Sequence, residues 1–121
     1  MEAPIGMDDA AAVLAALADP DTAQRARGAR AAQHFPACGP ALCAHLQSET
    51  DRAVRAHILT TLIKIQNREL AQCLLGYLRS DDVALRNEVI IALQQMPQHI
   101  APFMPDLLRD PDPDVLKSYG A

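Results

Sequence analysis

Two histidines and two cysteines stand close together in the first half of this sequence, and all four are residue types that bind zinc. Within twelve residues come His34, Cys38, Cys43 and His45. Cys43 and His45 are two residues apart on an expected helix, so they point to nearly opposite sides of it. Cys43 also holds the apolar position that Leu75 occupies in a later segment. We therefore expect no metal and no cofactor.

The carboxylates do not suggest acid–base catalysis, because most of them fall in a turn that returns four times. Each turn begins with a leucine, which polar and acidic residues follow. The leucines are Leu17, Leu46, Leu78 and Leu108. They are 29, 32 and 30 residues apart, and a fixed period in this range is typical of stacked helical repeats.

Between these turns the apolar residues follow helical spacing. One stripe runs from Val54 to Ile65, and the same stripe returns 31 residues later from Leu85 to Met96. A shorter helix follows each stripe, so the expected unit is helix, short turn, helix and acidic turn. No strand is predicted. The sequence predicts helices at 8–18, 21–34, 39–48, 51–65, 68–79, 82–96 and 99–109, with a stub at 113–119.

Aspartates mark the expected starts of the long helices, where a carboxylate accepts unpaired N–H groups. The three are Asp21, Asp51 and Asp82. Gly28 lies inside the first of these helices and should weaken it by about 1 kcal/mol relative to alanine. Pro105 falls inside the last helix and predicts a kink or an early end.

Composition excludes several classes of protein. The chain has 121 residues, of which 50% are hydrophobic, and a net charge of −4. It lacks a basic stripe, which argues against a nucleic-acid surface. Its apolar stretches are shorter than a membrane span, and Met1–Met7 lacks a signal pattern. The sequence therefore predicts a cytoplasmic protein with no membrane and no nucleic-acid partner. Its richness in alanine, arginine and aspartate suggests a bacterial source.

An arginine follows each aspartate by four residues, as in Asp51-x-x-Val54-Arg55 and Asp82-x-x-Leu85-Arg86. This phrase resembles HEAT repeats, most closely the short type of phycobilisome-lyase-like proteins. The resemblance implies an all-α fold, an α-α superhelix or solenoid of about four short helix pairs. It also implies a structural ladder between adjacent repeats, formed by Asp21, Arg25, Asp51, Arg55, Asp82 and Arg86.

The expected organisation is a single HEAT-like domain over residues 1–121. Its parts are a half unit at 8–18, repeats at 20–48, 50–79 and 81–109, and a stub at 112–121. The stub is either a cap, or the chain is a fragment of a longer array.

The resemblance also suggests enzymes. HEAT-like deoxyhypusine hydroxylase binds iron through His-Glu pairs, and none of the four histidines here precedes a glutamate. HEAT-like DNA glycosylases need a basic groove, which this acidic chain lacks. An accessory bilin lyase-like or chromophore-handling role stays open as the alternative, although no residue stands out as catalytic.

In stacked helix pairs the second helices line a concave face. The outward positions on these helices are His45, Cys73, Tyr77, Phe103 and Leu107, with Gln72 and Asp106 beside them. We expect this strip to bind a partner, although Phe103 and Leu107 could instead pack beneath the terminal stub. Arg25, Arg27 and Arg30 are interpreted as a solvated helix face.

The prediction is therefore a non-catalytic scaffold or adaptor that binds another protein or a peptide. Self-association through an exposed terminal repeat is a further possibility. The sequence does not identify the partner.

Overall fold

The computed structural model describes residues 9–105, which form helices and turns and contain no strand. The expected all-α class is therefore confirmed for this range. The chain divides into two compact units, one ending at Ile65 and the other beginning at Gln66. The single domain over 1–121 stays a prediction.

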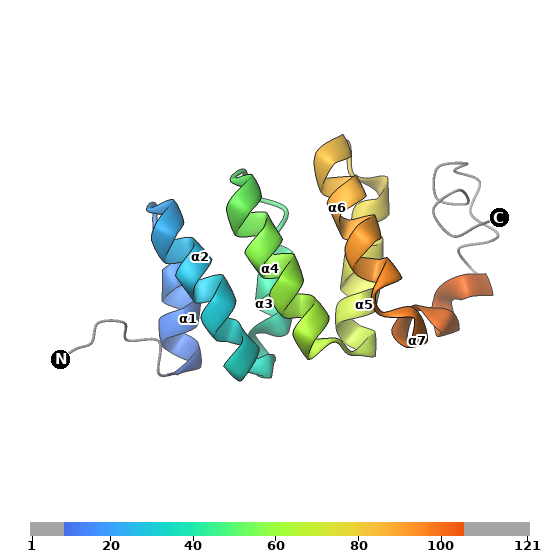
Figure 1. Ribbon diagram of the computed structural model, residues 1–121, viewed down its shortest axis with the longest axis horizontal. Helices are drawn as coiled ribbons and strands as arrows, with labels where there is room; N and C mark the ends of the chain where they lie inside the picture. The colour runs from blue at the N-terminus through green and yellow to red at the C-terminus, as the bar shows by residue number, and fades with distance from the viewer. Residues whose placement is uncertain (1–8, 106–121) are drawn as a thin grey trace. The chain divides into compact units, whose positions relative to one another are not determined.

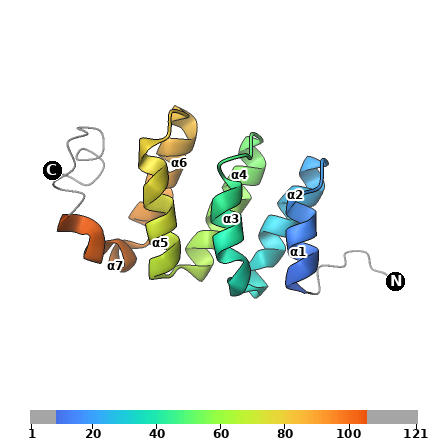
Figure 2. The same cartoon turned by 180° about the vertical axis from the view of Figure 1, so that it is seen from behind.

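The first unit holds four α-helices in two layers. These helices are α1 (Ala10–Leu17), α2 (Thr22–Ala31), α3 (Gly39–His45) and α4 (Arg52–Ile65). Helices α2 and α4 pack side by side on the face seen in Figure 1. Helices α1 and α3 lie on the opposite face, which is seen in Figure 2. Two short 3-10 turns, Ala32–His34 and Pro36–Cys38, connect the layers.

Aspartate side chains begin the long helices, as the sequence predicts. Asp21, Asp51 and Asp82 each accept a backbone N–H from two or three residues later, at 3.0–3.1 Å. Each carboxylate also meets the positive end of its helix dipole. Such a cap contributes about 1 kcal/mol, so the acidic turns are accounted for by helix initiation.

Gly28 lies where α2 packs closely against α1. A Cβ at this position would lie 2.8 Å from the Ala16 Cβ and 3.3 Å from the Val13 carbonyl oxygen. Both atoms are fixed to the α1 backbone, so neither can move aside easily. The glycine that weakens α2 as an isolated helix therefore allows the two helices to approach.

The core of the first unit is aliphatic. Its fully buried large side chains include Val13, Leu42, Leu46, Val54, Ile58 and Leu62. The Thr61 hydroxyl is also buried in this unit. It donates a 2.7 Å hydrogen bond to the carbonyl oxygen of Ala29 and so joins α4 to α2.

The second unit is smaller. Its α-helices are α5 (Arg68–Leu75), α6 (Val83–Gln94) and α7 (Pro97–Ile100). The buried side chains of this unit include Leu70, Leu74, Leu78, Leu85, Val89, Leu93, Met96 and Ile100. The Arg68 guanidinium lies over the Phe103 ring, 5.4 Å from its centroid. This contact joins the start of α5 to the segment that follows α7.

Two expected helices of the second unit contain 3-10 turns. The helix expected at 68–79 ends at Leu75 and continues as the 3-10 turn Gly76–Arg79. The helix expected at 99–109 begins at Pro97 and gives way after Ile100 to the 3-10 turn Ala101–Phe103. Pro102 lacks the N–H that a continued α-helix would need. The α-helical conformation returns at Met104 and Pro105, so the effect expected of Pro105 falls outside the described residues, as does the stub expected at 113–119.

Candidate protein-binding site

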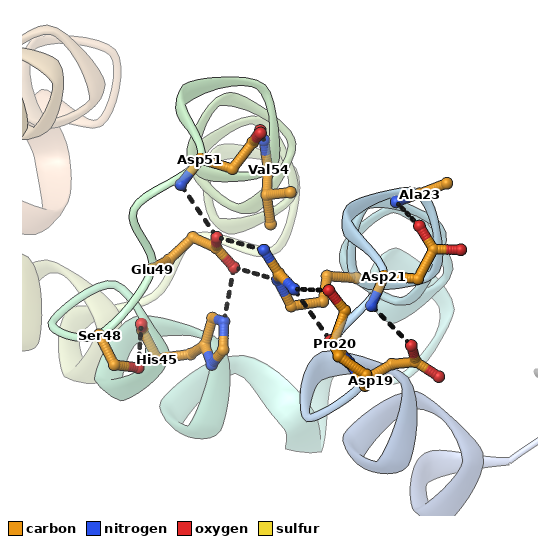
Figure 3. A network of polar contacts seen from close by, with 10 residues as sticks. Asp19, Pro20, Asp21, Ala23, His45, Ser48, Glu49, Asp51 and Val54 are labelled. Carbon is orange, nitrogen blue, oxygen red and sulfur yellow. Dashed lines mark hydrogen bonds and ion pairs between the residues drawn. The ribbon is translucent and has the colours of Figure 1, made fainter.

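The side chain of Glu49 is buried in the first unit, with 1% of its surface exposed. Its two oxygens accept four hydrogen bonds, and Figure 3 shows them converging on this carboxylate. Arg25 donates two of them, from Nε at 2.9 Å and from Nη2 at 3.1 Å. His45 Nε2 donates at 2.8 Å and the Asp51 N–H at 3.1 Å, because a carboxylate only accepts.

The hydrogen-bond partners of Glu49 determine whether Glu49 and Arg25 are charged. Burial desolvates Glu49 and acts to raise its pKa, but hydrogen bonds from Arg25, His45 and the Asp51 N–H outweigh burial. The pKa of Glu49 is therefore lowered from its ordinary value. The hydrogen bond to Glu49 is in turn the main reason that the pKa of Arg25 is raised. Both groups are ionised at neutral pH.

Arg25 also fixes the acidic turn before its own helix. Its Nη1 donates to the carbonyl oxygens of Asp19 and Pro20, at 2.9 Å each. In the second unit Arg86 Nη1 donates in the same way to the Ser80 carbonyl oxygen, at 3.3 Å. In both units the arginine reaches a carbonyl six residues earlier. This contact is therefore a shared feature of the repeat.

The ladder implied by the resemblance pairs aspartates with arginines. For Arg25 the carboxylate in contact is Glu49, 24 residues later, while Asp21 caps α2. Sequence reasoning missed Glu49. One signal was available: Glu49 stands two residues before Asp51, as Asp19 stands two residues before Asp21. The ladder stays a prediction for Asp51, Arg55, Asp82 and Arg86.

Two adjoining hollows open in the first unit. One has a volume of about 340 Å³ and is lined by the acidic turns, with Arg25, His45 and Glu49 at its side. The other has a volume of about 330 Å³ and is mostly apolar; its lining is Leu14, Leu17, Ala18, Ala41, Ala44 and His45. Three residues line both hollows: Leu17, Ala18 and His45. Leu14, at 43% exposure, lies at this surface.

The predicted binding residues fall in both units. His45 is half-buried and lies between the two hollows of the first unit. In the second unit Gln72 is exposed, while Cys73 and Tyr77 are half-buried on α5 and the turn after it. Phe103 is half-buried beneath Arg68. Asp106 and Leu107 lie outside the described residues, and the strip as a whole stays a prediction.

Neither a metal centre nor a membrane span is found in the described range. Among residues 9–105, no three His, Cys, Asp or Glu side chains are placed to hold a metal ion. His34 is exposed, whereas Cys38 and Cys43 are buried. Over the same residues, no helix has the length and apolarity that crossing a bilayer requires.

A family model for HEAT repeats matches residues 39–119, well over half of the sequence. The chain belongs to the HEAT-repeat family. HEAT repeats commonly mediate protein–protein interactions and are typically non-catalytic. No curated protein and no solved structure matches this chain.

In this HEAT-repeat protein Arg25 and Glu49 have a structural role, whereas His45 lies at the surface. Arg25 and Glu49 satisfy each other and fix the turns, and Glu49 also fixes one nitrogen of the His45 ring. His45 is thereby held at a surface that also presents Leu14 and Ala41. A surface with rigid apolar and polar groups side by side is suited to binding.

Proposed function

We propose that this HEAT-repeat protein is a non-catalytic adaptor that binds a peptide or protein segment on the face of its second helices. In the first unit these are α1 and α3. The observation that carries the proposal is the pair of adjoining hollows that meet at His45. The hollows differ in character, since polar and apolar groups line one about equally and the other is mostly apolar.

A peptide with an apolar side chain next to a polar one would match this arrangement. The apolar side chain would contact Leu14 and Ala41, and the polar one would lie beside His45. Because Glu49 already orients His45, binding would cost little additional side-chain entropy. Anchors held in this way are typical of residues that dominate binding energy.

The second unit would contribute the remaining predicted contacts. These are Gln72, Cys73, Tyr77, Phe103, Asp106 and Leu107. The phycobilisome-lyase-like subtype, self-association, the cytoplasmic location and the bacterial source stay predictions. An accessory chromophore-handling role is the alternative, and a shift in the absorbance of an added linear tetrapyrrole would favour it.

Selection from a displayed library of random peptides tests the proposal with purified components. We expect peptides that share an apolar residue next to a polar one, and we expect them to compete with one another. Recovery of no binder, together with an absorbance shift for the tetrapyrrole, would favour the alternative over the adaptor role.

A further inference from the structure

Helices α2 and α4 carry basic side chains and no acidic one. Helix α2 contributes Arg25, Arg27 and Arg30, and α4 contributes Arg52, Arg55 and Lys64. The whole chain has a net charge of −4, so its charges are segregated along the sequence. Between residues 9 and 65, every carboxylate lies before a helix or in a turn: Asp9, Asp19, Asp21, Glu49 and Asp51.

Three of these cations contact no carboxylate among the described residues. Arg27 has no ion pair in that range, in contrast to Arg25, which Glu49 neutralises. The side-chain partner of Arg30 is the imidazole of His57, with Nη1 and Nε2 at 3.4 Å. The partner of Lys64 is the amide oxygen of Gln33, also at 3.4 Å.

These contacts place the cations along one ridge. Arg27 and Arg30 are three residues apart on α2 and so share a side of that helix. Arg30 contacts His57 of α4, and Gln33, just after α2, contacts Lys64 of α4. We name Arg27, Arg30 and Lys64 the basic face. Its residues belong to α2 and α4, the helices of the layer seen in Figure 1.

Helix dipoles explain part of this pattern. Arg30 and Lys64 lie in the last turns of their helices, where a cation stabilises the negative end of the dipole. The dipole does not explain why the exposed positions beside them lack acidic residues. Those positions are small and uncharged: Ala23, Ala53, Ala56 and Thr60. A surface without a binding role ordinarily mixes charges of both signs.

We propose that the basic face binds an acidic segment of a partner protein. Two carboxylates one helical turn apart would match Arg27 and Arg30, which are themselves about one turn apart. A third carboxylate would reach Lys64 on the neighbouring helix. The occupant is therefore a short segment, such as a helix with glutamates four residues apart. This binding is independent of the hollows on α1 and α3.

The extent of the face favours an acidic protein segment over nucleic acid. Helix α4 has 14 residues and is about 21 Å long. The acidic turns stand at the N-terminal ends of the same helices, with Asp19, Asp21, Glu49 and Asp51. A long phosphate backbone would run from the cations onto these carboxylates and be repelled, whereas a compact segment would avoid them.

Fluorescence anisotropy with a labelled alanine-based helical peptide tests the proposal. The probe carries three glutamates at four-residue spacing, and a second peptide carries lysines in their place. The variant Arg30→Gln/Lys64→Gln removes two exposed cations from the face. The control, Arg68→Gln/Arg79→Gln, removes two exposed arginines of the second unit. Circular dichroism checks that both variants fold.

We expect the chain to bind the glutamate peptide and not the lysine peptide, more weakly as salt rises. The first variant should weaken binding about tenfold, and the control should change it less than about twofold. Equal losses in the two variants would overturn the proposal, because net charge alone would then explain binding. Failure of the unaltered chain to bind the glutamate peptide at low salt would also overturn it. Tighter binding of a single-stranded oligonucleotide of equal charge would overturn the choice of partner.

Discussion

Arg25 and Glu49 meet in a two-pronged ion pair across 24 residues of sequence, with Nε–Oε1 at 2.9 Å and Nη2–Oε2 at 3.1 Å. The arginine comes from α2, and the glutamate comes from the turn before α4. The pair therefore joins two successive long helices through the turns that begin them. It also sets the position of His45 at the proposed binding surface.

Replacing Glu49 with glutamine should lower the free energy of unfolding by about 2 kcal/mol. The amide keeps the shape of the side chain but puts an NH₂ group where Arg25 or the Asp51 N–H now donates. One buried donor would then face another. Chemical denaturation measures the loss. The control is Glu69→Gln, at an exposed position of α5, which should change stability by less than about 0.5 kcal/mol.

The same carboxylate predicts a dependence on pH. Because the folded pKa of Glu49 is lowered, its contribution to stability is fully present above the ordinary value of 4.5. The contribution disappears as pH falls through the lower, folded value. The stability difference between the unaltered chain and Glu49→Gln should therefore shrink on acidification below that value. A difference that grows on acidification would show that the carboxylate is not stabilised as described.

Gly28→Ala should destabilise the protein by about 1–3 kcal/mol, although alanine is the better helix former. The added methyl group would lie 2.8 Å from the Ala16 Cβ. Gly76→Ala is the matched control, since a Cβ there meets nothing within 4 Å. Thermal unfolding of both variants is the measurement. Stabilisation by Gly28→Ala would mean that α1 and α2 are farther apart than described.

Thr61→Val should lower the free energy of unfolding by about 1 kcal/mol, because the buried hydrogen bond to the Ala29 carbonyl is lost. Its neighbour provides a direct comparison. Thr60 is exposed on the same helix, so Thr60→Val should stay within about 0.5 kcal/mol of the original. Equal effects of the two substitutions would show that the hydroxyl of Thr61 does not help to join α4 to α2.

Local features of this fold could be predicted from the sequence, whereas contacts distant in sequence could not. The caps of Asp21 and Asp82 follow from residue type and the start of a periodic stripe, and both are confirmed. Arg25, by contrast, contacts a carboxylate that is distant in sequence. Its partner is Glu49, because the packing of α2 beside α4 brings the two turns together.

In the candidate site, too, local features could be predicted from the sequence and distant contacts could not. His45 was selected by its position in the repeat, and it does line both hollows. The hollows themselves depend on how far apart side chains of α1 and α3 lie, which no periodicity reveals.

Binding of a selected peptide to two alanine variants tests the adaptor role. Ala41 lines the apolar hollow on α3, and Ala53 is exposed on α4, outside both hollows. Titration calorimetry should show that Ala41→Gln weakens binding about tenfold or more, because the longer side chain occupies the hollow. Ala53→Gln should leave the affinity unchanged. Equal affinities for both variants would contradict the account, because the peptide would then bind elsewhere than the face of α1 and α3.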